Sequence, residues 1–251
     1  MQVLVTVAHP DDETFGTGSL IALAAEQGAQ VTVCCATRGE AGEAHDVPAD
    51  ADLAAVREAE LRAAGAVIGV DRFVLLDFGD SGMTGEAPPG SLAAAPLDDV
   101  AAAVRTVLDD VRPDIVVTLD PDYGDGHRDH TAIGRATVEA CRAVPDVRVY
   151  VWTVTRSLLA GWLAHLGEVR PESAHLELDH QGIGRADEDI TTWLDIGHLR
   201  DIRLRAAALH RSQVFPFAGM PDELLSAFLD TDRLVRVQPP WTGGDPERAL
   251  F

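Results

Sequence analysis

The chain has 251 residues, of which 46% are hydrophobic, and its formal net charge is −21. So large a negative charge argues against nucleic acid as a partner, because a phosphate backbone attracts basic surfaces. All 20 basic residues are arginine. The absence of lysine from the sequence excludes Schiff-base lysine chemistry, the Walker A lysine and the protein-kinase strand lysine.

No apolar run approaches the roughly 18 residues that a membrane span requires. The first residues turn acidic at once and lack the basic and apolar regions of a secretory signal. We therefore expect a soluble, cytoplasmic protein with no membrane partner. The sequence leaves open whether it forms a homo-oligomer.

The first 154 residues alternate between apolar strands and amphipathic helices. Strands are predicted at residues 2–8, 30–37, 72–78, 114–120 and 147–154. Helices are predicted at residues 18–28, 52–65, 97–111 and 130–144. Strands that are apolar along their whole length, each followed by a helix, are typical of a parallel sheet covered on both faces.

After about residue 155 the alternation weakens. Residues 173–180 and 188–196 resemble half-exposed strands, residues 198–213 a helix, and residues 233–240 a final edge strand that ends at a proline pair. The sequence therefore predicts a single α/β domain over residues 1–251. We expect a Rossmann-like, mainly parallel sheet with helices on both faces and a looser C-terminal part that adds edge strands.

The first predicted strand ends in a cluster of ionisable side chains, AHPDDE at residues 8–13. Pro10 forces His9 into an extended conformation and is well placed to begin a helix. His9 and Asp12 are three positions apart across the turn and can converge on one point, whereas Asp11 projects differently. Helix capping explains one aspartate but not a histidine beside two of them, so a metal site and a capping role are both open.

A second cluster, DPDYGDGHRDH at residues 120–130, follows the fourth predicted strand. It places His127, Asp129 and His130 at the start of the next helix. The first and fourth strands flank the reversal point of the commonest doubly wound sheets, where ligands bind beyond the carboxyl ends of strands. A strand-end histidine and aspartate with one distant histidine suit catalytic zinc and also non-haem Fe(II).

Together the two clusters resemble the PIG-L/LmbE-like zinc-dependent N-deacetylases, which remove acetyl groups from N-acetylglucosamine units. The specific motifs are AHPDDE at residues 8–13 and GHRDH at residues 126–130. Supporting similarities are TRGEAG at 37–42, Arg57 with Glu60, and HRSQ at 210–213. The resemblance extends over most of the chain and implies a hydrolase that acts on a small amino-sugar substrate.

The resemblance also implies a role for each residue of the two clusters. The metal ligands that it implies are His9, Asp12 and His130. The metal is expected to be Zn²⁺, with Fe²⁺ or another divalent ion as the alternative. Asp11 is the implied general base, and His127, oriented by Asp129, stabilises the oxyanion or donates a proton to the leaving amine. The set is chemically complete, because amide hydrolysis needs a polarised carbonyl, an activated water and a group that stabilises the developing charge.

Candidates for substrate contacts surround these clusters: Arg38, Arg57, Asp80, Tyr123 and Asp125. Arg38 and Arg57 are suited to hydrogen-bond sugar hydroxyls, and Asp80 follows the third predicted strand. Some relatives carry a tyrosine where this chain has Asp125, and Tyr123 is the nearest tyrosine here.

Three other functions fit the same residues. They are an amidase that cleaves a larger acyl group or a thiol-conjugate amide from a glucosamine scaffold, a non-haem Fe(II) oxygenase, and a non-catalytic sugar-binding protein. The presence of Asp11, His127 and Asp129 favours a hydrolase, because sugar binding alone needs none of them. For His210 and Gln213, on the last predicted helix, a packing role and a site role are both open.

Overall fold

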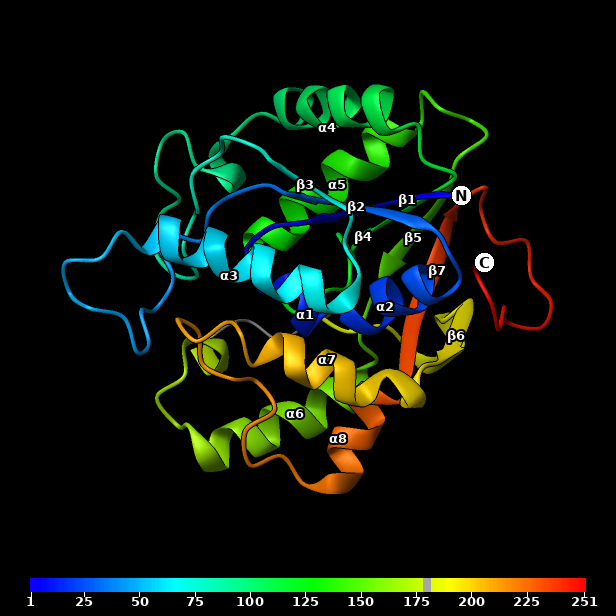
Figure 1. Cartoon of the computed structure of the whole chain (residues 1–251). Coiled ribbons are helices and arrows are strands. Elements are labelled where there is room, and N and C mark those ends of the chain that lie inside the picture. Colours follow the sequence, from blue (N-terminus) through cyan, green and yellow to red (C-terminus); the bar gives the residue numbers. More distant parts are fainter. Residues whose placement is uncertain (178–181) are drawn as a thin grey trace.

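The computed structural model describes residues 1–177 and 182–251. Within these residues it contains a seven-stranded sheet in the order β3-β2-β1-β4-β5-β7-β6 (Figure 1). The strands are β1 (Gln2–Val7), β2 (Gln30–Cys35), β3 (Arg72–Leu75), β4 (Ile115–Leu119), β5 (Arg148–Trp152), β6 (Thr192–Asp195) and β7 (Thr231–Gln238). Strands β1 to β5 are parallel, and β7 is antiparallel to its neighbours β5 and β6. The predicted α/β class with a mainly parallel sheet is confirmed.

Helices cover both faces of the sheet. The α-helices of the described residues are α1 (Asp12–Phe15), α2 (Gly18–Glu26), α3 (Leu53–Ile68), α4 (Leu97–Val111), α5 (Arg128–Cys141), α6 (Arg156–Val169), α7 (Arg200–Ala207) and α8 (Asp222–Leu229). In Figure 1, α4 and α5 lie on one side of the sheet, and α2, α3 and α7 lie on the other.

Each face of the sheet has its own hydrophobic core, because successive side chains of a strand point to opposite faces. From β1, Val3, Val5 and Val7 pack in one core with residues of α2, α3 and α7. Leu4, between them, packs in the other core with residues of α4 and α5. Burial on both faces explains why four of the six residues of β1 are valine or leucine.

The C-terminal part differs from its prediction. The last strand, β7, lies between β5 and β6, so β6 is the edge strand there. Residues 174–177 form a 3-10 helix instead of a strand, and the rest of that predicted strand, with His180, lies outside the described residues. The predicted helix at 198–213 ends at Ala207.

Helices α6 and α8 were not predicted. They contact each other, and residues of both join a third hydrophobic cluster with residues of α7. This cluster includes Phe15 of α1, Trp162 of α6, Phe228 of α8 and Phe217, which precedes α8. The aromatic side chains of this cluster therefore connect the C-terminal helices to α1, the short helix that follows β1.

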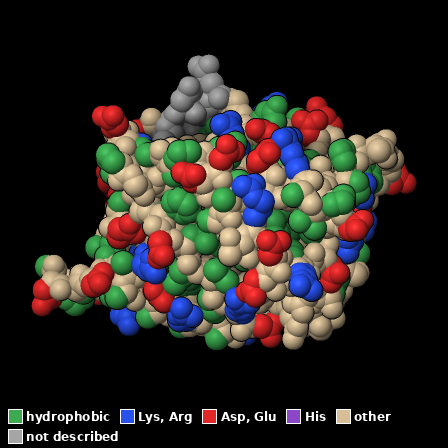
Figure 2. Space-filling view, turned by 90° about the horizontal axis from the view of Figure 1, so that it is seen from above, with side chains coloured by type: hydrophobic (Ala, Val, Ile, Leu, Met, Phe, Trp, Pro, Cys, Tyr) green, Lys and Arg blue, Asp and Glu red, His purple; other side chains and the backbone are tan. Residues whose placement is uncertain are grey.

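None of the helices in the described part of the chain is long and apolar enough to cross a membrane. On the face drawn in Figure 2, arginine and acidic side chains are interspersed. Charges on this face therefore have neighbours of opposite sign, in spite of the net charge of −21.

Candidate active site

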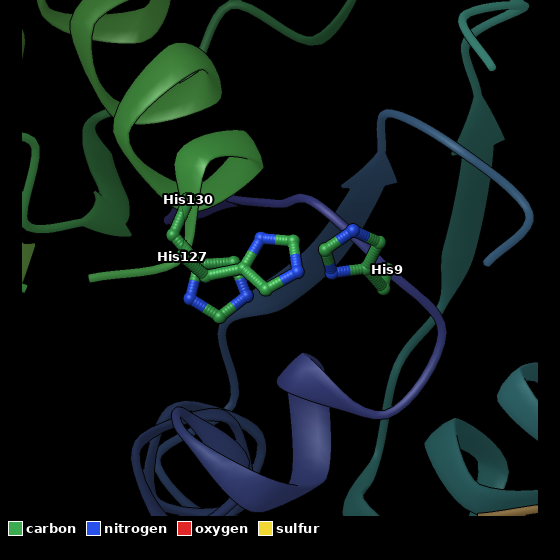
Figure 3. A group of neighbouring side chains, drawn as sticks. All are labelled: His9, His127 and His130. Atoms are coloured by element: carbon green, nitrogen blue, oxygen red, sulfur yellow. The ribbon is translucent and has the colours of Figure 1, made fainter. Parts of the chain in front are cut away.

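Two loops at neighbouring strand ends bring the candidate residues together. Because β1 and β4 are adjacent and parallel, the loops that follow them leave the same edge of the sheet. The loop after β1 carries His9 and leads into α1, which begins at Asp12. The loop after β4 leads into α5, whose N-cap is His127 and whose first turn contains His130. Figure 3 shows the three imidazoles gathered in one place.

Three imidazoles and a carboxylate form the centre of the site. Ring nitrogens of His9, His127 and His130 lie within 4.8 Å of one another. The Asp12 carboxylate lies between two of these rings, with Oδ2 3.6 Å from His9 Nδ1 and Oδ1 3.1 Å from His130 Nε2. Imidazole nitrogen and carboxylate oxygen are the ligands that zinc and iron take in catalytic sites.

Two of the imidazoles have a second carboxylate at the nitrogen that faces away from Asp12. His9 Nε2 lies 3.2 Å from Asp129 Oδ2, and His130 Nδ1 lies 2.9 Å from Asp125 Oδ2. Metal-binding histidines usually donate their other N–H to a carboxylate in this way, which fixes the tautomer and the ring orientation. The arrangement of His9, Asp12 and His130 therefore fits a metal ion.

Electrostatics also favour a cation at this place. Burial alone would lower the pKa of His130, but Asp12 and Asp125 raise it to about 10. Burial acts in the same direction on His9, whose pKa is nevertheless raised by the carboxylates around it. The carboxylates that stabilise these imidazolium ions also favour a divalent metal ion at the same place. Binding of that ion displaces protons from the imidazoles.

Asp11 combines an unusual backbone with a perturbed carboxyl group. Its φ of 136° lies in a region that non-glycine residues rarely adopt. Its side chain lines the cavity described below, and Oδ2 accepts a hydrogen bond from Arg57 Nη2 at 2.8 Å. Burial raises the pKa of Asp11 to about 6, although the Arg57 guanidinium opposes this shift. Such a pKa suits a general base near neutral pH.

His127 is oriented differently from the prediction. The carboxylate of Asp129 points to His9 and accepts the backbone N–H of Ser81 at 2.9 Å. It is the backbone N–H of Asp129 that donates to His127 Nδ1, at 3.2 Å, because His127 is the N-cap of α5. An imidazole that accepts at Nδ1 carries its proton on Nε2 when neutral.

The charge state of His127 follows from its surroundings. Burial, together with the nearby cationic His130 and His9, lowers the pKa of His127 to about 3. The ring is therefore neutral at physiological pH. It can donate one hydrogen bond from Nε2 towards the cavity, as an oxyanion stabiliser requires.

Three of the five predicted substrate-contact residues line the cavity. Arg57, Asp80 and Asp125 line the cavity. Arg57 is occupied by Asp11 and by two backbone carbonyls, and Asp125 by His130. Asp80 Oδ1 lies 3.6 Å from His9 Nε2, so this residue belongs to the carboxylates around the histidines.

Arg38 and Tyr123 are not among the residues that line the cavity in the described part of the chain. Arg38 points to Glu58 and Asp77. Tyr123 is 38% exposed, and its ring lies 4.5 Å from the Arg185 guanidinium. This contact holds the ring outside the cavity.

The cavity has a volume of about 360 Å³. Part of its lining is an aromatic wall that the sequence did not reveal. This wall is made of Phe15, Trp152, Trp162, Phe217 and Phe228. An aromatic residue gives no sign in the sequence of whether it faces a cavity or a packed core, and two of the helices involved, α6 and α8, were themselves not predicted.

The sequence is similar over most of its length to that of a curated protein. That protein is the 1D-myo-inositol 2-acetamido-2-deoxy-alpha-D-glucopyranoside deacetylase of Rhodococcus opacus (strain B4). The two sequences are 38% identical over 239 residues, which cover 85% of this chain and 82% of that protein.

Two solved structures illustrate the fold. The N,N'-diacetylchitobiose deacetylase of Pyrococcus horikoshii has a TM-score of 0.61 at 20% identity and covers 94% of this chain and 83% of its own. The 4-carboxy-2-hydroxymuconate hydratase GalB of Pseudomonas putida KT2440 has a TM-score of 0.62 at 20% identity. The match covers 97% of this chain and 98% of the hydratase. At such identities the likeness shows the fold alone, and the fold carries more than one chemistry.

The family model described as "PIG-L: GlcNAc-PI de-N-acetylase" matches residues 4–141, more than half of the chain. This range contains AHPDDE at residues 8–13 and GHRDH at residues 126–130. The resemblance inferred from these motifs is thus confirmed, and the chain belongs to the PIG-L family of GlcNAc-PI de-N-acetylases.

Proposed function

We propose that this protein is a zinc-dependent hydrolase that removes the N-acetyl group from a small molecule containing N-acetylglucosamine. The observation that carries the proposal is the buried set of His9, Asp12 and His130 with the Asp11 carboxylate in the same cavity. The names of the relatives make an N-acetylglucosaminyl inositol the first substrate to test. Fe²⁺ is the alternative metal, because the same ligand set suits it.

The mechanism assigns separate parts to the metal ligands, to Asp11 and to His127. A metal ion held by His9, Asp12 and His130 supplies Lewis acidity for the amide carbonyl and for water. Asp11 takes a proton from the attacking water, with its carboxylate held by Arg57. A base whose pKa is about 6 can later return that proton to the leaving amine.

His127 acts on the developing negative charge. Its neutral ring donates from Nε2 to the oxygen that becomes an oxyanion as water adds to the amide. The Asp129 backbone N–H, which binds Nδ1 at 3.2 Å, keeps the ring in the tautomer that can donate. Preorganised donors of this kind are among the largest contributions to catalysis in acyl transfer.

The pH dependence provides a test of the Asp11 and Arg57 pair. The Asp11 base works only when deprotonated, so kcat/KM is expected to fall as the pH drops through the pKa of this group. Arg57→Gln removes the charge that lowers this pKa, and the acidic limb is expected to move up by about one pH unit. Arg57→Lys, which keeps the charge, is the control. A limb that stays in place or moves to lower pH in Arg57→Gln would refute the coupling.

Acetate and amine release from a series of N-acetylglucosaminides tests the activity itself. The series comprises the myo-inositol glycoside, free N-acetylglucosamine and N,N'-diacetylchitobiose, each incubated with zinc-loaded protein. We expect release from all three, fastest from the inositol glycoside. No release from any of them by metal-loaded protein would refute the proposal.

One observation favours a second function within the same chemistry. The aromatic wall and the cavity of about 360 Å³ offer more apolar space than an acetyl methyl group fills. An amidase that removes a longer acyl chain from glucosamine would use that space. Faster cleavage of N-butanoyl or N-octanoyl glucosamine than of N-acetylglucosamine would support this second function.

Three further features belong to the proposal. We infer a single domain over residues 1–251, since both hydrophobic cores are built on one sheet. We also infer a cytoplasmic location and a small amino-sugar substrate in place of a macromolecular partner.

A further inference from the structure

The backbone of Asp11 is fixed by buried hydrogen bonds. Its φ is 136° and its ψ is −31°, and such a conformation persists only when the surroundings determine it. The carbonyl of Asp11 accepts from the N–H groups of Thr14 and Phe15 at 2.9 and 2.8 Å. The N–H of Asp11 donates to Glu13 Oε2 at 2.9 Å. This last hydrogen bond fixes the peptide plane between Pro10 and Asp11.

Glu13 is held in turn by a residue from the far end of the chain. Glu13 is fully buried, and its Oε1 accepts a hydrogen bond from His210 Nε2 at 2.6 Å. His210 lies just after α7, is 2% exposed and packs edge-on against the ring of Phe15. A carboxylate buried to this degree needs such a partner, because burial without one is costly.

Neither Glu13 nor His210 takes part in the proposed reaction. Among the described residues, both are absent from the lining of the cavity and from the groups that could hold a metal ion. Their hydrogen bonds lead to the Asp11 N–H instead. Glu13 and His210 form a buried polar pair outside the cavity, and Glu13 is hydrogen-bonded to the backbone of the strained residue Asp11. This connection indicates that the pair sets the position of Asp11.

We propose that Glu13 and His210 are positioning residues for Asp11: His210 orients Glu13, and Glu13 holds the Asp11 N–H so that the carboxylate is aimed into the cavity. The inference rests on the proposed function, in which Asp11 is the base. Arg57 anchors the other side, since its Nη2 donates to Asp11 Oδ2 and to the carbonyl of Pro10, both at 2.8 Å. Without Glu13 the backbone of Asp11 can relax to negative φ, which turns the carboxylate away.

The kinetic test compares variants that remove or keep the hydrogen bonds. Glu13→Ala is expected to lower kcat about 100-fold, the loss that a misplacement of about 1 Å can cause, with KM and bound zinc unchanged. Glu13→Gln keeps an oxygen that accepts from the Asp11 N–H, so kcat is expected to return to within a few-fold of wild type. His210→Leu is expected to lower kcat, and His210→Gln, whose amide can donate to Glu13, to restore it.

Glu60→Ala is the matched control. Glu60 accepts from the backbone N–H of Ser212 at 2.9 Å and from its hydroxyl at 2.5 Å, so it anchors the segment of His210 to α3. We expect Glu60→Ala to lower Tm and keep kcat. The proposal is wrong if Glu13→Ala keeps wild-type kcat, or if both variants lose kcat in proportion to their loss of Tm.

Crystal structures of the zinc-loaded wild type and Glu13→Ala give a readout that needs no turnover. The expected result is a φ near 136° for Asp11 in the wild type and a negative φ in the variant. An unchanged Asp11 in the variant would overturn the inference. If the wild type released no acetate, the proposed function would be wrong. The two crystal structures would still show whether Glu13 holds the backbone of Asp11. If Glu13→Ala did not fold, His210→Leu would take its place in both tests.

Discussion

Asp11→Asn is expected to lower kcat by about 10²- to 10⁴-fold, the usual contribution of a general base. Asparagine has nearly the same shape and its oxygen still accepts from Arg57, but it cannot take a proton from water. The bound zinc and the Tm are therefore expected to stay close to those of the wild type. Acetate release measures kcat, and elemental analysis measures the metal.

Asp46→Asn is the matched control for this substitution. Asp46 also has a positive φ, of 50°, but it forms an exposed ion pair with Arg211. Its replacement is expected to leave kcat unchanged. If Asp11→Asn turned over substrate as fast as Asp46→Asn, Asp11 would not be the base.

His130→Ala is expected to lose both metal and activity. Outer carboxylates that orient a ligand already contribute about 10- to 100-fold to metal affinity, so the loss of a ligand itself is expected to exceed 100-fold. Competition with a chromophoric zinc chelator measures the affinity. Asp125→Asn, which loses only the charge beside His130 Nδ1, is expected to fall between His130→Ala and the wild type.

His127→Ala discriminates between the two histidines of α5. Ring nitrogens of His127 and His130 both lie within 4.8 Å of those of His9, but only His130 contacts Asp12, at 3.1 Å. We expect His127→Ala to keep zinc and to lose kcat, because an oxyanion donor is removed. Loss of zinc in His127→Ala and its retention in His130→Ala would reverse the assignment.

The sequence predicted the elements that rest on local patterns. Continuous apolar stretches such as residues 2–8 and 114–120 gave the central parallel strands, since a strand buried on both faces needs no polar positions. The position of both motifs at carboxyl ends of neighbouring strands predicted that His9 and His130 would meet. Both features follow from the spacing of apolar residues and from the common direction of parallel strands.

Features that depend on contacts between distant segments were out of reach. The direction of the Asp129 carboxylate depends on the Ser81 N–H, which comes from the loop after β3. Glu13 and His210 are 197 residues apart in the chain. The helix α6 has apolar residues at many positions of its sequence. It lies after residue 155, where the βα alternation that revealed the earlier helices weakens.

The fold by itself does not decide the chemistry, since a hydratase has the same architecture with a TM-score of 0.62. Deacetylation is favoured by the residues of the site and by the family to which the chain belongs. In particular, Asp11, the proposed base, and His127, the proposed oxyanion donor, line the same cavity as the candidate metal ligands, as amide hydrolysis requires.

A zinc titration of metal-free protein tests the central claim most directly. Acetate release from the N-acetylglucosaminyl inositol is measured after addition of increasing amounts of Zn²⁺ or Fe²⁺ to protein stripped with a chelator. We expect release to rise from background and to reach its maximum at one equivalent of the physiological metal. Full activity of the metal-free protein, or no activity with either metal, would contradict the account.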